Sequence, residues 1–111
     1  MKLTKKIKTK WIAALRSGKY KQVTGTLYDP KTKGFCCLGV LEHICMDGNV
    51  ETVLYHNGVR AYMGVPSREF YNAYDVVMSP GDVSVLTNMN DGLRLDFKGI
   101  AKWIEKHVET K

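Results

Sequence analysis

The sequence lacks the long apolar runs and the paired cysteines of membrane-spanning and disulfide-stabilised proteins. None of its apolar runs approaches the ~18 residues that a membrane span needs. Its lysine-rich start has no apolar segment of the kind found in secretory signals. Its three cysteines are an odd number with two adjacent in sequence, which fits a disulfide framework poorly. We therefore expect a cytoplasmic protein with no membrane contact and with reduced thiols.

Catalytic motifs are absent as well. His43, His56 and His107 are scattered along the chain, and none has a carboxylate or a nucleophile at a motif spacing. The chain has no GxSxG, two-histidine hydrolase or zinc-protease pattern. The sequence therefore favours a protein that is not an enzyme and that carries no cofactor.

Acidic residues are missing from the first 28 positions. This segment holds eight lysines and arginines, giving +8, whereas the other 83 residues hold nine basic and eleven acidic residues, giving −2. Such a local field attracts nucleic acid, nucleotides or an acidic protein, although a solvated helix face that only aids solubility is the alternative. The candidate basic surface consists of Lys2, Lys5, Lys6, Lys8 and Lys10. The sequence leaves open whether residues 1–5 form a flexible basic N-terminus.

The hydrophobic pattern predicts a single α+β domain over residues 1–111. Helical spacing predicts a helix over residues 4–17 and a buried helix over 36–45, with a hairpin around Asp29–Gly34 between them. Asn57-Gly58 is the preferred two-residue turn of a second hairpin. A short helical turn is expected over residues 67–72.

Two further helices are indicated near the end of the chain. Ser79 and Asp82 form a capping box around Pro80, and Asp96 caps a last helix with an apolar stripe. The whole is expected to be a small antiparallel sheet, made of two hairpins, packed with about four helices.

Adjacent cysteines, Cys36 and Cys37, lie in an apolar run. Structural zinc takes four ligands in closely spaced pairs, and adjacent cysteines diverge on a helix or a strand, so a site with Cys45, His43 and His56 is poorly supported. No CxxC spacing or neighbouring cation indicates a reactive thiol. We therefore interpret both thiols as core residues, with no metal site, and Gly39 as a point where another element approaches closely.

Four motifs of the sequence together resemble those of a known set of proteins. The chain contains W-x-x-A-L-R-S-G-x-Y-x-Q over Trp11–Gln22, C-C-L-G-V-L within Gly34–Leu41, an Asn-Asp pair within Leu86–Asp91 and F-x-x-I-A-x-x-I-E over Phe97–Glu105. This arrangement resembles small uncharacterised proteins of tailed phages and prophages. Asp96 replaces the serine of that pattern, and residues 50–79 match none of it. The resemblance implies a phage origin and no particular mechanism.

Three groups of residues are candidates for ligand binding. Arg16, Lys19 and Gln22 follow the first helix and could hold a phosphate, although a helix C-terminus favours cations, which makes a solvated basic end the alternative. The other two groups are Tyr55, Arg60 and Tyr62 on one face of the second hairpin, and the Asn90-Asp91 pair. The hairpin group could stack a base or form only an internal cation–π pair. The Asn-Asp pair could read ribose hydroxyls or only cap a turn.

The resemblance implies a phage accessory protein, and the lack of catalytic motifs favours one that acts by binding in the host cytoplasm. Host takeover or anti-defence is the expected role, with sequestration of a nucleotide-like immune signal, as a homo-oligomer, as its specific form. Nucleic-acid binding through the basic N-terminal helix and direct inhibition of an acidic host protein are the alternatives.

Overall fold

The computed structural model describes residues 1–45 and 74–110, and within them it shows four α-helices, one π-helical segment and two small sheets. The α-helices are α1 (Lys5–Arg16), α2 (Cys37–Cys45), α5 (Pro80–Thr87) and α6 (Phe97–His107). The α+β class predicted from the sequence is confirmed. The predicted Asn57-Gly58 hairpin and the turn at 67–72 lie outside the described residues.

The helices begin where the sequence provides capping side chains. Thr4 caps α1 by accepting from the Ile7 N–H, and Asp96 caps α6 by accepting from the Gly99 N–H. Ser79 and Asp82 form the predicted capping box of α5. The predicted N-terminal ends of α1, α5 and α6 are therefore confirmed, because each helix begins at a side chain that can cap it.

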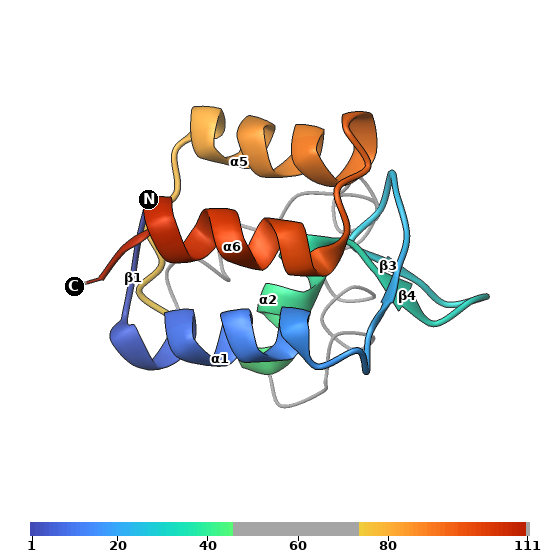
Figure 1. Ribbon diagram of the computed structural model, residues 1–111, viewed down its shortest axis with the longest axis horizontal. Helices are drawn as coiled ribbons and strands as arrows, with labels where there is room; N and C mark the ends of the chain where they lie inside the picture. The colour runs from blue at the N-terminus through green and yellow to red at the C-terminus, as the bar shows by residue number, and fades with distance from the viewer. Residues whose placement is uncertain (46–73, 111) are drawn as a thin grey trace.

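The hydrophobic core lies between α1, α2, α5 and α6. In Figure 1, α6 lies between α5 and α1, with α2 behind them, and α1 packs most extensively against α6. Trp11 of α1 is fully buried and donates from its indole Nε1 to the Cys37 carbonyl at 3.0 Å, which joins α1 to the start of α2. No helix in the described ranges is both long enough and apolar enough to span a bilayer.

The first hairpin is present but joins a mixed sheet. Its strands, β3 (Tyr28–Asp29) and β4 (Gly34–Phe35), are antiparallel, as expected. The Asp29 carboxylate accepts from the Lys31 N–H at 2.9 Å, which fixes the turn. The expectation of a purely antiparallel sheet is corrected, because β2 (Lys21–Gln22) pairs with β4 in parallel.

A second sheet joins the two ends of the described chain. Strand β1 (Lys2–Leu3) pairs in parallel with β5 (Glu109–Thr110), and Figure 1 shows both at one end of the molecule. Leu3 is fully buried, and Lys2 also bridges to Val77 through two backbone hydrogen bonds. The sequence left open whether residues 1–5 are flexible. In the structure, residues 2–3 are held in place by strand pairing.

Candidate functional site

The adjacent thiols are part of the core, as the sequence predicted. Cys36 is 5 % exposed and Cys37 is fully buried. Burial raises the pKa of Cys36 to about 11 and raises that of Cys37 well above its ordinary value. The Cys36 sulfur accepts from the Gly39 N–H at 3.4 Å, at the first turn of α2. Both thiols therefore stay protonated near neutral pH and contribute packing, and that of Cys36 also caps the first turn of α2.

No metal-binding cluster is formed by the residues that the structure describes: no three His, Cys, Asp or Glu side chains among them come together in a suitable group. His43 packs edge-on against Tyr20 and Phe35, with ring centroids at 5.3 and 5.0 Å. Partial burial lowers the pKa of His43, which favours the neutral imidazole in this aromatic cluster.

Asn90 and Gln22, two of the predicted ligand residues, meet each other inside the protein. The Asn90 side chain is 1 % exposed, and its Oδ1 accepts from Gln22 Nε2 at 2.9 Å and from the Cys37 N–H at 3.3 Å. Its Nδ2 donates to the Val23 carbonyl at 2.9 Å and to Asp91 Oδ1 at 2.7 Å. These contacts give Asn90 the structural role that the sequence allowed, and its role in reading a ligand stays a prediction.

The other predicted ligand residues do not converge. Arg16 pairs with Glu105 of α6 at 2.9 Å, and Lys19 is exposed just after Gly18, which ends α1 with a φ of +76°. Asp91 lines a shallow groove beside α5 and η2 (Asn88–Gly92). The third group, Tyr55, Arg60 and Tyr62, lies outside the described residues.

The basic N-terminal surface divides into structural and free lysines. Lys8 donates to the Val108 and Glu105 carbonyls at 2.7 and 3.2 Å, so it stabilises the C-terminal end of α6. Lys2 lies 3.8 Å from the carboxylate of Glu109. The remaining members of this surface, Lys5, Lys6 and Lys10, are exposed.

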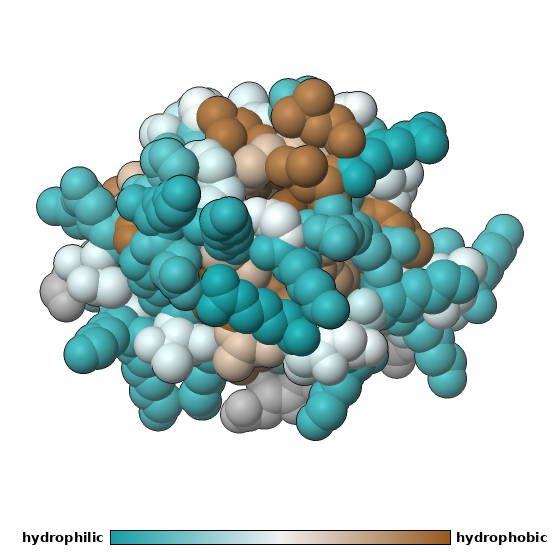
Figure 2. All heavy atoms as spheres, in the orientation of Figure 1, coloured by the Kyte–Doolittle hydropathy of each residue, from teal (hydrophilic) through white to brown (hydrophobic). Residues whose placement is uncertain are grey.

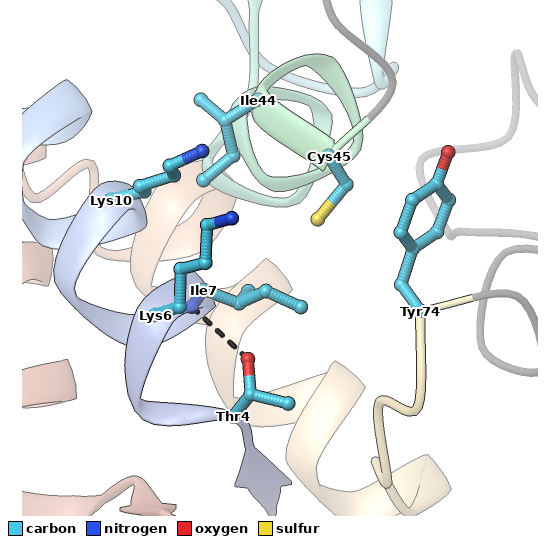
Figure 3. A pocket seen from close by; sticks show the side chains of 7 residues that line it. All are labelled: Thr4, Lys6, Ile7, Lys10, Ile44, Cys45 and Tyr74. Carbon is cyan, nitrogen blue, oxygen red and sulfur yellow. Dashed lines mark hydrogen bonds between the residues drawn. The ribbon is translucent and has the colours of Figure 1, made fainter.

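Lys6 and Lys10 converge on a pocket that the sequence did not reveal. We call this the lysine pocket; it has a volume of about 310 Å³ and is lined by Thr4, Lys6, Ile7, Lys10, Ile44, Cys45 and Tyr74. In Figure 3 the two ammonium groups point from α1 into the space beside the end of α2, and the Tyr74 ring stands across from them. Thr4 accepts from the Ile7 N–H at 3.1 Å, which fixes the first turn of α1 at the pocket floor.

The chemistry of the lysine pocket suits an anion with an apolar body. Among the described residues, its lining contains two lysines and no acidic residue, and it adjoins the N-terminal turn of α1, which carries a partial positive charge. Ile7 and Ile44 offer apolar walls, and Tyr74 offers an aromatic ring. A negatively charged group could therefore be held by the lysines while a flat apolar part packs on the opposite wall.

Sequence reasoning named only Lys6 and Lys10 among the lining residues of this pocket, and named them as part of the basic surface. Lys6 and Lys10 are four residues apart, so their shared helix face was visible in the sequence. Ile44 and Cys45 are brought to them only by the packing of α2 against α1, and Tyr74, which precedes α5 in the chain, lies across from them. No spacing in the sequence indicates a contact between elements so far apart in the chain.

Comparison with known proteins gives a family and no activity. No curated protein and no solved structure matches the chain. The model of one family, described as "Domain of unknown function (DUF8296)", matches residues 3–64, which is more than half of the 111 residues and includes every residue of the lysine pocket except Tyr74. The chain therefore belongs to the DUF8296 family.

Proposed function

We propose that this protein is a phage accessory protein that binds a small, anionic, nucleotide-like ligand in the lysine pocket. Removal of such a ligand from host defence signalling is the role that we propose for it. The observation that carries the proposal is the convergence of two exposed lysines on a pocket that also offers an aromatic ring and apolar walls. The resemblance to phage proteins supplies the biological setting.

The size and charge of the pocket support a compact ligand. A volume of about 310 Å³ lies at the lower end of the range of about 300–1,000 Å³ seen for small-molecule sites. Among the residues that the structure describes, no carboxylate lines the pocket to offset the positive charge of Lys6 and Lys10. A phosphate group would supply the missing negative charge, and a base or another planar ring would fill the space beside Tyr74.

Binding is measured by thermal shift and calorimetry on the purified protein. The ligands are inorganic phosphate, AMP, cyclic mononucleotides, cyclic dinucleotides and ADP-ribose. A ligand of the pocket stabilises the folded state by mass action, by about 2.7 kcal/mol at a hundredfold excess over Kd. We expect at least one phosphorylated ligand to raise Tm, and we expect Lys6→Gln/Lys10→Gln to abolish that rise.

A double variant with the same loss of charge serves as the control. Lys19→Gln/Lys21→Gln also removes two exposed positive charges, but neither residue lines the pocket. This variant should keep at least half of the ligand-induced rise in Tm. The proposal is wrong if no ligand raises Tm, or if both double variants lose the rise to the same extent.

A further inference from the structure

The C-terminal helix α6 carries a row of lysines that did not stand out in the sequence. Lys98, Lys102 and Lys106 recur every four residues, so they follow one another along one side of the helix, over a length of about 12 Å. All three are exposed. We call them the α6 lysine row.

The α6 lysine row has no counter-charge among the residues that the structure describes. Glu105 is the only acidic residue of α6, and it pairs with Arg16 of α1 at 2.9 Å. No ion pair engages Lys98, Lys102 or Lys106 within the described ranges. Like charges four residues apart destabilise a helix, so the row is a cost to the isolated protein that an anionic partner would offset.

The row extends the positive charge of α1 into a broader surface. Helix α1 has five basic and no acidic residues, and α6 has three lysines and one glutamate, so the two helices together carry +7. The whole chain carries +6, so the remainder is −1. Because α1 and α6 lie side by side, this charge is gathered on one part of the molecule, and Figure 2 shows mainly hydrophilic side chains across it.

The composition of this surface distinguishes between classes of partner. Protein interfaces usually have an apolar or aromatic centre and few lysines, whereas nucleic-acid interfaces are polar and rich in positive charge. The large hydrophobic side chains that are exposed within residues 1–45 and 74–110 are Val77, Val85, Leu93 and Leu95, and none of them belongs to α1 or α6. In Figure 2 the hydrophobic atoms gather above α6, over α5, and not along α6 itself.

We propose that the surface formed by α6 and the adjoining side of α1 binds the phosphate backbone of nucleic acid, with the α6 lysine row as its principal contact. Regularly spaced lysines match a polymer that repeats its negative charge, and such contacts do not depend on base sequence. This surface is separate from the lysine pocket, because no residue of α6 lines the pocket. All of the row also lies beyond the part of the chain that the family model matches, which ends at residue 64.

The test is the salt dependence of binding, measured by fluorescence anisotropy with a DNA duplex and with single-stranded RNA between about 50 and about 300 mM salt. For the unaltered protein, log K should fall linearly with log salt. Lys98→Gln/Lys102→Gln/Lys106→Gln should weaken duplex binding at least tenfold at the lowest salt. It should also reduce the slope by about 0.9 for each lysine that contacts a phosphate.

The control removes the same charge from another part of the molecule. Lys19→Gln/Lys31→Gln/Lys33→Gln changes three exposed lysines outside α1 and α6, and it should weaken binding less than threefold. Circular dichroism should show that both triple variants fold, with the Tm of the α6 variant no lower than that of the control, because the α6 substitutions remove like charges four residues apart. Equal weakening by the two variants, or no binding at the lowest salt, overturns the proposal.

Two further measurements distinguish nucleic-acid binding by this surface from binding of acidic proteins and from a single shared site. Polyglutamate that displaces the nucleic acid at an equal concentration of charge would assign the surface to acidic proteins and would also overturn the proposal. The α6 triple variant should keep any ligand-induced rise in Tm that depends on Lys6 and Lys10, since those residues lie in a different site. Loss of nucleotide binding together with nucleic-acid binding would contradict two separate sites.

Discussion

At the scale of single residues, Gly39 has the clearest structural requirement. A Cβ at this position of α2 would lie well inside the van der Waals distance of the Leu27 carbonyl oxygen and 2.8 Å from its carbon. The Cys36 N–H donates to the same carbonyl at 3.2 Å, so the backbone near Leu27 is anchored and cannot withdraw freely. The sequence prediction of a close approach at Gly39 is thereby confirmed, and its partner is identified.

Replacement of Gly39 by alanine should therefore be strongly destabilising. We expect Gly39→Ala to lower the free energy of unfolding by roughly 3 kcal/mol, because the methyl group forces α2 away from Leu27. Urea denaturation measures the change. Gly81→Ala is the control, since the nearest atom to its added Cβ is Ser79 Oγ at 3.6 Å. Equal stabilities of the two variants would contradict the close approach.

Asn90 is the second residue whose loss should be costly. Asn90→Ala would leave the Cys37 N–H and the Val23 carbonyl without their partner, and unfolding free energy should fall by about 2–4 kcal/mol. Gln22→Ala provides a graded comparison, because it removes only one of the hydrogen bonds of Asn90. We expect its effect to be less than half as large, as measured by thermal and urea denaturation. An Asn90→Ala variant as stable as Gln22→Ala would show that the buried amide does not organise this region.

At the scale of elements, the start of α5 should give the protein a specific sensitivity to acid. The Ser79 N–H donates to the Asp82 carboxylate at 2.9 Å, and this hydrogen bond is the main reason why the pKa of Asp82 lies below its ordinary value. A carboxyl group with a lowered folded-state pKa stabilises the fold above its unfolded pKa. That contribution is lost as the pH falls through the folded pKa.

The predicted window lies below about pH 4, since the ordinary pKa of an aspartate is 3.8. Asp82→Asn should be less stable than the unaltered protein at pH 7, and the difference should shrink between pH 4 and pH 2. Thermal denaturation over this range measures it. Asp96→Asn tests whether the effect belongs to Asp82 in particular, because both residues begin helices. A stability difference that does not change with pH would contradict this assignment.

Much of the helical framework could be predicted because its signals are local. Thr4, Ser79 and Asp96 indicate helix starts within a few residues of the chain, and the Asp29 turn does the same for the first hairpin. The parallel pairing of β2 with β4 could not be predicted, because strands of two residues have almost no hydrophobic pattern. The same applies to the joining of β1 and β5.

In the candidate sites, too, local features could be predicted from the sequence and contacts between distant elements could not. The helical face shared by Lys6 and Lys10 could be predicted from their spacing, but Tyr74 could not be placed beside them. Sequence reasoning assigned Asn90 two alternative roles, and only its burial favours the structural one. The α6 lysine row was visible as a four-residue repeat, yet its importance depends on the position of α6 beside α1.

At the scale of the whole molecule, charge and hydrophobicity are separated. The charge of α1 and α6 is gathered on one part of the surface, and the exposed hydrophobic side chains of the described residues lie elsewhere, including Val85 on α5 and the segment from Leu93 to Leu95. Ligand and nucleic-acid binding, as proposed above, would use neighbouring parts of the charged side. Because no residue of α6 lines the lysine pocket, double variants of the pocket and triple variants of the α6 lysine row should have additive effects on overall stability.

The packing of α1 against α6 also governs when the protein can fold during its synthesis. Helix α1 is made first among the helices, but α6, its most extensive partner, is made last. The packing of α1 against α6 can therefore be completed only when nearly all of these residues have left the ribosome, whereas α2, which receives the Trp11 hydrogen bond, is available earlier. Until α6 is synthesised, the hydrophobic face of α1 that packs against it stays exposed to chaperones. The time needed to translate the chain therefore sets a lower limit on how soon the protein becomes functional.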